Sequence, residues 1–153
     1  MHIIPADISD PRVMALVDAH LAHVRVALPP ESVHALKMEQ LSSPDISFWT
    51  VWDGDAAVGM GALKRLSSDH GEVKSMFVAE SSRGRGFGAA MLRHIIAAAK
   101  AEGMSRLSLE SGSREYFIPA HRLYAALGFS ACGPFGDYKP DPISVFMTLD
   151  LKK

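Results

Sequence analysis

Apolar residues recur at helical spacing near the start of the chain. The members of this apolar face are Val13, Leu16, Val17, Leu21 and Val24. Asp10 before Pro11 offers an N-cap followed by a proline at the first helical position, and the Pro29-Pro30 pair ends the run. The pattern predicts a helix that begins after Asp10 and a second, shorter helix over residues 31–40.

Strand patterns occupy the middle of the chain. Residues 46–52 are rich in β-branched and aromatic side chains, and residues 56–66 follow them after the turn signal Asp53-Gly54-Asp55. This arrangement predicts a hairpin. Residues 72–78 predict a third strand, and the short apolar start at residues 2–4 predicts one more.

A strand–helix–strand unit follows the hairpin. Small and apolar residues predict a helix over residues 84–102, stopped by Gly103, and a strand over residues 105–110. A helical crossover of this kind makes the two strands it joins parallel. A short helix at residues 119–127 and strands at 129–132 and 144–151 complete a mixed sheet that is antiparallel first and parallel at one pair.

Composition limits the classes of partner. The 153 residues suit a single domain, residues 1–153, and 16 Lys and Arg against 17 Asp and Glu give a net charge of −1. No global positive field therefore attracts nucleic acid or an anionic membrane. Cys132 is the one cysteine, no apolar run reaches the length of a membrane helix, and the start does not resemble a signal peptide. We expect a soluble cytoplasmic protein.

A glycine- and arginine-rich turn is the most informative segment. Arg83-Gly84-Arg85-Gly86-Phe87-Gly88 joins the end of a predicted strand to the start of the long helix. Unpaired amides at a helix start, the helix dipole and two arginines converge there, and this combination suits a pyrophosphate. The alternative is a tight turn with solvated charges.

Two other phosphate-binding patterns do not fit this turn. A P-loop needs a lysine followed by Ser or Thr after its second glycine, and none follows these glycines. A dinucleotide-binding fingerprint needs its third glycine where this chain has Ala89, and it normally belongs to the first strand of a larger domain.

The remaining pattern, Arg83-x-x-Gly86-x-Gly88, resembles the acyl-coenzyme A pyrophosphate signature of the GNAT superfamily of N-acetyltransferases. Residues 120–129, which read Ala-x-x-x-Tyr-x-x-x-Gly-Phe, are similar to a later block of the same superfamily. The resemblance covers residues 46–150, and within the superfamily it points to small bacterial enzymes of undefined acceptor. It implies a mixed α/β fold with a mostly antiparallel sheet of six to seven strands, a splayed parallel pair and flanking helices.

The resemblance also implies a site for acetyl-coenzyme A (acetyl-CoA). The residues expected to bind this cosubstrate are Met76, Phe77, Val78, Arg83, Gly84, Arg85, Gly86, Phe87, Gly88 and Ala89. One departure concerns the pantetheine arm, because Phe117 stands where the superfamily often carries an asparagine. Ser111 or Ser113 could substitute for that amide.

Two catalytic roles follow from the chemistry of acyl transfer to an amine. An alkylamine is almost entirely protonated at pH 7, at a cost of about 4.6 kcal/mol for the free base, so a base is needed. Glu72 occupies the position of the superfamily's frequent catalytic glutamate, and Glu110 is the competing base. The resemblance implies that Tyr124 donates a hydrogen bond or a proton to the leaving thiolate. The structural alternatives are solvated strand-end charges and an aromatic ring packed on a helix face.

The acceptor site has the weakest sequence signals. His34, Arg114 and Tyr138 are its candidate residues, the last in a proline-rich loop over residues 135–142 that could serve as a lid. His20 and His23 lie one helical turn apart, but no third ligand is suggested, so no metal is expected.

These features predict direct transfer of an acetyl group from acetyl-CoA to a primary amine of a small molecule or peptide. The alternative from another class is a non-catalytic acyl-CoA sensor, and a longer acyl chain is a further alternative. The acceptor's identity and the oligomeric state stay open, with a homodimer among the possibilities.

Overall fold

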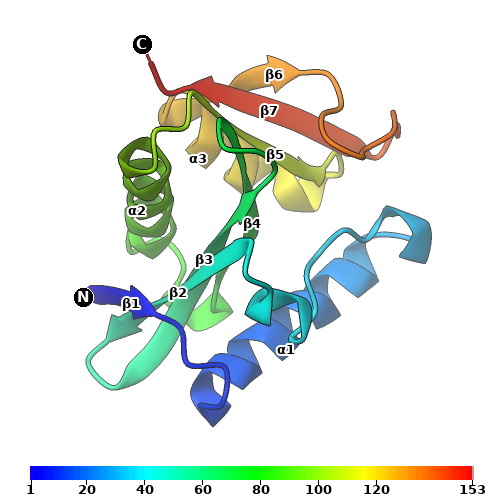
Figure 1. Cartoon of the computed structure of the whole chain (residues 1–153). Coiled ribbons are helices and arrows are strands. Elements are labelled where there is room, and N and C mark those ends of the chain that lie inside the picture. The colour runs from blue at the N-terminus through cyan, green and yellow to red at the C-terminus, as the bar shows by residue number, and fades with distance from the viewer. Residues whose placement is uncertain (153) are drawn as a thin grey trace.

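One seven-stranded sheet organises residues 1–152, the part of the chain that the computed structural model describes (Figure 1). The strands are β1 (His2–Pro5), β2 (Ile46–Asp53), β3 (Ala56–Arg65), β4 (His70–Val78), β5 (Arg106–Gly112), β6 (Ser130–Cys132) and β7 (Ser144–Asp150). Their order is β1-β2-β3-β4-β5-β7-β6. Every neighbouring pair is antiparallel except β4 and β5, which are parallel. The predicted mixed sheet with one parallel pair is confirmed.

Helices cover both faces of this sheet. The α-helices are α1 (Pro11–Ala27), α2 (Phe87–Ala101) and α3 (Ile118–Ala126), and short 3-10 turns are η1 (Pro30–Ser32), η2 (Gln40–Ser42), η3 (Glu80–Ser82) and η4 (Glu115–Phe117). The Asp10 side chain accepts a hydrogen bond from the Arg12 main-chain N–H at 2.9 Å, so the predicted N-cap of the first helix is confirmed. Among the helices of residues 1–152, none combines the length and apolar character that a bilayer crossing requires.

The predicted helix over residues 31–40 is wrong. The segment contains η1 and then runs irregularly to η2. Its anchors are tertiary, because Leu36 is buried and the Ser32 hydroxyl donates a hydrogen bond to Asp141 at 2.7 Å. Contacts with distant segments therefore overrode the local helical tendency of these residues.

The helix α2 also begins later than predicted, at Phe87 rather than at Gly84. Gly84 and Gly86 have positive φ angles of 78° and 88°, which are outside the right-handed helical region. The two glycines instead form a left-handed turn that leads into α2.

Two apolar layers hold the helices against the sheet. One layer joins α1 to Met60, Ala62 and Phe77, and the other joins α2 and α3 to the opposite face of the same strands. Alternation along β3 explains the division, because successive side chains of a strand point to opposite faces. At Gly61, a Cβ would lie 2.6 Å from Met91 of α2, so this close approach of the helix requires glycine.

The sheet opens at its parallel pair. β4 and β5 pair only from His70↔Arg106 to Glu72↔Ser108, and their later residues diverge (Figure 1). The register between β3 and β4 also shifts, and Ser75 has a positive φ of 57° at this irregularity. The predicted splay of the parallel pair is thus confirmed, and it leaves the main chain of β4 beyond Glu72 without a strand partner on that side.

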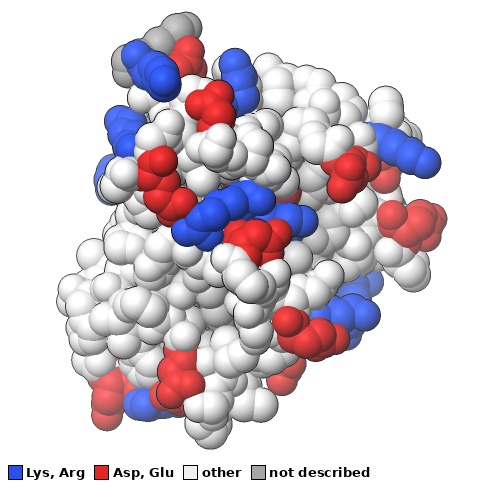
Figure 2. Space-filling model, in the orientation of Figure 1, with Lys and Arg blue, Asp and Glu red and all other residues white. Residues whose placement is uncertain are grey.

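Acidic and basic side chains are interspersed over the face in Figure 2, and neither sign forms a large field. This distribution agrees with the net charge of −1.

Candidate active site

The turn before α2 presents free main-chain amides. The first backbone hydrogen bond of the helix runs from the Ala90 N–H to the Gly86 carbonyl at 3.0 Å. Within residues 1–152, none of the amides from Gly84 to Ala89 donates a hydrogen bond. These groups and the positive end of the helix dipole suit an anion with several oxygen acceptors.

A cavity of about 550 Å³ extends from this turn into the gap between β4 and β5, and we call it the cofactor cavity. Met76, Phe77 and Val78 of β4 line it, as do Ser111 and Phe117. From the predicted turn the cavity receives Arg83, Gly84, Gly86, Phe87, Gly88 and Ala89. The structure therefore brings most of the predicted cofactor residues together around one continuous cavity.

Tyr124 and Glu110 lie on the same cavity, on the side of α3 and β5. Tyr124 is 7% exposed, and its hydroxyl forms no hydrogen bond within residues 1–152. Burial, with a smaller contribution from Glu110, raises the pKa of Tyr124 to about 12, so the phenol keeps its proton near neutral pH. Burial also raises the pKa of Glu110, whose buried Oε2 has no hydrogen-bond partner among residues 1–152.

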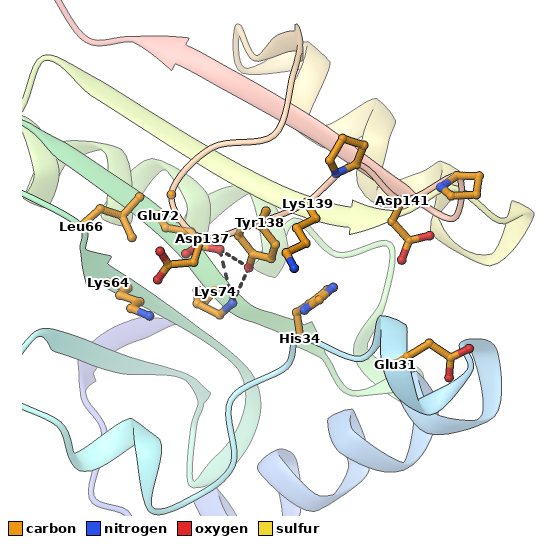
Figure 3. Close-up of a pocket in the computed structure, with 13 residues that line it drawn as sticks. Glu31, His34, Lys64, Leu66, Glu72, Lys74, Asp137, Tyr138, Lys139 and Asp141 are labelled. Carbon is orange, nitrogen blue, oxygen red and sulfur yellow. Dashed lines mark hydrogen bonds and ion pairs between the residues drawn. The ribbon is translucent and has the colours of Figure 1, made fainter.

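Glu72 lies in a second cavity, of about 670 Å³, which we call the acceptor cavity (Figure 3). Glu72 is 2% exposed, and its Oε2 accepts hydrogen bonds from the Tyr138 hydroxyl at 2.5 Å and from Lys74 Nζ at 3.3 Å. Lys74 Nζ also donates to the Tyr138 hydroxyl at 2.8 Å. Burial and the carboxylate of Glu72 raise the pKa of Tyr138, so its hydroxyl stays a donor. The nearby ammonium compensates the charge of this buried carboxylate, while Oε1 accepts no hydrogen bond within residues 1–152.

The two cavities adjoin. His34 and Lys74 line both of them, and we call the boundary at these two side chains the passage. The His34 ring contacts the edge of Tyr138, with ring centroids 5.0 Å apart. Burial and the nearby Lys74 lower the pKa of His34, which favours a neutral imidazole at this passage.

Two predicted site residues point elsewhere. Arg85 forms an ion pair with Asp53 at 2.9 Å and lines neither cavity. Arg114 donates to the Ala27 carbonyl at 2.7 Å and ties the segment after β5 to the end of α1. We therefore drop Arg114 from the acceptor site and Arg85 from the cofactor contacts.

Other lining residues were not predicted as site residues. Lys74 lies two positions after Glu72 on β4, and the two-residue period of a strand could have indicated that they share a face. His20 lines the cofactor cavity from α1, packs against Phe77 at 5.3 Å between centroids, and has a buried Nδ1 without a partner. Nothing in the local sequence distinguishes His20 from an ordinary core histidine.

A family comparison identifies this arrangement. A sequence model described as the acetyltransferase (GNAT) family matches residues 14–129. The chain belongs to the GNAT family of acetyltransferases. Over 151 residues, it is 48% identical to the uncharacterized N-acetyltransferase YsnE of Bacillus subtilis, covering 99% of this chain and all of YsnE. This GNAT protein is therefore an acyltransferase.

The fold of this chain is similar to that of solved GNAT acetyltransferases. A GNAT-family acetyltransferase from Staphylococcus aureus superposes with a TM-score of 0.73 at 21% identity, covering 98% of each chain. A GNAT acetyltransferase from Elizabethkingia anophelis, solved with acetyl-CoA bound, gives a TM-score of 0.68 at 17% identity, covering 97% of each chain.

The residues of this GNAT chain fit a coenzyme A thioester. The unpaired amides from Gly84 to Ala89 match a pyrophosphate, and the unpaired edge of β4 matches the amides of a pantetheine arm. In residues 1–152 no three His, Cys, Asp or Glu side chains gather in a way that could hold a metal ion.

Proposed function

We propose that the protein transfers an acetyl group from acetyl-CoA directly to a primary amine, without a covalent enzyme intermediate. The observation that carries this proposal is the single cofactor cavity. It joins the free amides of the α2 turn, the open gap between β4 and β5, and the Tyr124 hydroxyl. A bound thioester supplies the activated acetyl group, and the residues below bind it and move the protons.

The α2 turn would hold the pyrophosphate. Amides of residues 84–89 donate to the phosphate oxygens, and Arg83, which lines the cavity, adds positive charge. The Arg83 Nε also donates to the Val78 carbonyl at 3.0 Å, which fixes the guanidinium against the end of β4. Three or four charge-assisted hydrogen bonds of about 1.5–3 kcal/mol each are enough for micromolar affinity before ordering costs.

The open edge of β4 would hold the pantetheine arm and orient the thioester. Free main-chain groups between Met76 and Val78 can pair with the arm as an added strand would. A main-chain N–H in the gap can also stabilise negative charge on the thioester oxygen, an effect of about 3–4 kcal/mol in other acyl-transfer sites.

Glu72 would accept the proton of the acceptor ammonium, directly or through water. Its Oε1 is free while Oε2 is held by Tyr138 and Lys74, so the carboxylate is oriented and still has a basic oxygen. Glu110 is the alternative base, because it lies in the cofactor cavity and burial raises its pKa. Glu72 is favoured by its place in the cavity through which the amine would arrive.

Tyr124 would assist the departing thiolate by donating a hydrogen bond to it. Its pKa of about 12 keeps the phenol protonated, and a thiolate whose conjugate thiol has a pKa near 8.5 is a suitable acceptor for its hydrogen bond. His34 and Tyr138 of the acceptor cavity would contact the incoming amine.

Two measurements test this function. Calorimetry with coenzyme A and acetyl-CoA should show binding, and a thiol-release assay over amines, amino acids and peptides should show turnover that Tyr124→Phe reduces. Binding without turnover on any acceptor would favour an acyl-CoA sensor. Competition among thioesters of different chain length would show whether acetyl is the preferred group.

A further inference from the structure

The acceptor cavity contains charges of both signs that do not cancel within the protein. Glu72 and Lys74 pair with each other, but Lys64 and Lys139 form no ion pair within residues 1–152. The same holds for Glu31 and for the cavity's two aspartates. A ligand with a single charge would leave either these lysines or these carboxylates without a counter-ion.

One ammonium group lines the passage to the cofactor cavity, and a second points toward it from the acceptor cavity. Lys74 lines both cavities, and because an ammonium has three N–H groups, its bonds to Glu72 and Tyr138 leave one available. Figure 3 shows the Lys139 side chain reaching toward His34, the other residue that both cavities share. His34 is kept neutral by its surroundings and does not add a third positive charge. Lys74 is balanced by Glu72, whereas Lys139 has no ion pair within residues 1–152, so an anionic group is favoured beside Lys139, next to the point where the amine would enter.

The opposite end of the cavity is acidic. Figure 3 shows Glu31 and Asp141 beyond His34, away from Lys64 and Lys74. Asp141 is fixed there, because it accepts hydrogen bonds from Ser32 Oγ at 2.7 Å and from the Ile143 N–H at 3.0 Å. A ligand that spans the cavity thus meets positive charge at the passage and negative charge at the far end.

We propose that the acceptor is a free α-amino acid with a polar or cationic side chain. Its α-carboxylate would bind between Lys74 and Lys139, its α-amine would face the passage, and its side chain would extend toward Glu31 and Asp141. An α-amino acid fits because its amine and carboxylate share one carbon, so an anion held beside the passage places the nitrogen within it. This inference rests on the proposed acetyltransferase function and adds its substrate class.

The residues already described can carry out the transfer of the acetyl group to the α-amine. The α-ammonium gives a proton to Glu72, and the α-nitrogen then forms a bond to the acetyl carbonyl carbon. The carbon–sulfur bond breaks and the nitrogen releases its second proton to solvent. The coenzyme A thiolate, which accepts a hydrogen bond from the Tyr124 hydroxyl, takes up one proton from solvent, and Glu72 then releases its proton to solvent. The products are an N-acetyl amino acid and coenzyme A.

Other amines match the cavity less well. A polyamine would bring positive charge to the two lysines at the passage, where like charges repel. A peptide N-terminus carries a neutral amide in place of the α-carboxylate and would leave the Lys139 ammonium group without a counter-ion.

The test compares free amino acids with their carboxamides, which keep the shape and remove the charge. Thiol release is measured for each pair at pH 7.5 with saturating acetyl-CoA. The α-amine of a carboxamide is less basic and more often unprotonated, so a site indifferent to the carboxylate would prefer the carboxamide. We expect kcat/KM to be at least about tenfold higher for the free acid, as one charge-assisted hydrogen bond would give.

A pair of lysine variants links this preference to the cavity. Lys139→Gln should lower the ratio of acid to carboxamide by about tenfold or more. The matched control is Lys100→Gln, which removes an exposed lysine of α2 that lines neither cavity and should leave the ratio unchanged.

The outcomes separate this inference from the proposed function. Turnover of carboxamides, alkylamines or peptides at rates equal to or above those of free amino acids overturns the inference and leaves the acetyltransferase function standing. Thiol release that depends on no amine at all, despite acetyl-CoA binding, overturns both. An unchanged ratio in Lys139→Gln overturns the placement of the carboxylate.

Discussion

The cofactor cavity and the acceptor cavity are lined by different kinds of chemical groups. The cofactor cavity is formed by strand ends, a helix start and the main-chain amides of a glycine turn. The acceptor cavity takes most of its lining residues from two segments outside the sheet, residues 31–34 and 136–142, and more than half of all its lining residues are charged. Main-chain groups recognise what every coenzyme A thioester shares, whereas side chains on loops can change without disturbing the sheet. A conserved chemistry and a variable acceptor can thus coexist in one small domain.

The largest expected effect tests whether the catalytic base lies in the acceptor cavity or in the cofactor cavity. Glu72→Gln keeps the shape of the acceptor-cavity carboxylate and removes its basicity, so kcat should fall by about 10²–10⁴. The affinity for coenzyme A should stay unchanged because Glu72 does not line the cofactor cavity. Stopped thiol-release assays and calorimetry measure the two quantities.

The matched control is Glu110→Gln in the cofactor cavity, which should lower kcat by less than about tenfold. If the Glu110 variant loses more activity than the Glu72 variant, the base lies in the cofactor cavity and our assignment is wrong.

The next largest effect is expected from removal of the Tyr124 hydroxyl. Tyr124→Phe retains the packed ring and removes the hydroxyl, so kcat should fall by about 10²–10³. The melting temperature should change little, because the hydroxyl has no hydrogen-bond partner within residues 1–152. A wild-type rate in this variant would assign the ring to packing alone.

A smaller effect concerns His20, which faces the cofactor cavity. Burial, with the nearby His23 and Lys74, lowers the pKa of His20 from 6.5 to about 4. Between these values the unfolded chain binds a proton that the folded chain does not, so stability falls as pH drops from 6.5 toward 4. The loss attributable to His20 is about 3 kcal/mol over this window.

The His20→Phe variant should lack this part of the pH dependence. Urea unfolding at pH 7 and at pH 4.5 gives the comparison, and the difference between the two pH values should be smaller in the variant than in the wild type. Equal differences would show that His20 titrates normally in the folded protein.

The smallest effect concerns the turn that precedes α2. Gly86→Ala meets no atom within 4 Å of the added Cβ, but its φ of 88° strains an alanine by about 1–2 kcal/mol. If the turn deforms to relieve this strain, the dissociation constant for coenzyme A should rise about 5–30-fold by calorimetry.

Gly54→Ala supplies the control for that strain. Gly54 has a φ of 61° with equally open space, in the turn between β2 and β3. The control should lower the melting temperature and leave the affinity of the folded protein for coenzyme A unchanged. The same weakening in both variants would remove the turn before α2 from the cofactor site.

The sequence by itself determined the parts of this protein that depend on local patterns. Asp10 and Pro11 predicted the start of α1, alternation and Asp53-Gly54-Asp55 predicted the β2–β3 hairpin, and the glycine turn pointed to the cofactor end of α2. These features could be predicted because caps, turns and strand alternation involve residues within a few positions of one another.

Only the tertiary structure decided what depends on distant contacts. It replaced the expected helix at residues 31–40 with an irregular segment, and it turned Arg85 and Arg114 away from the cavities. It also brought Tyr138 across 66 positions to the carboxylate of Glu72. Such pairings are set by how the loops pack on the opened sheet, and no local periodicity encodes them.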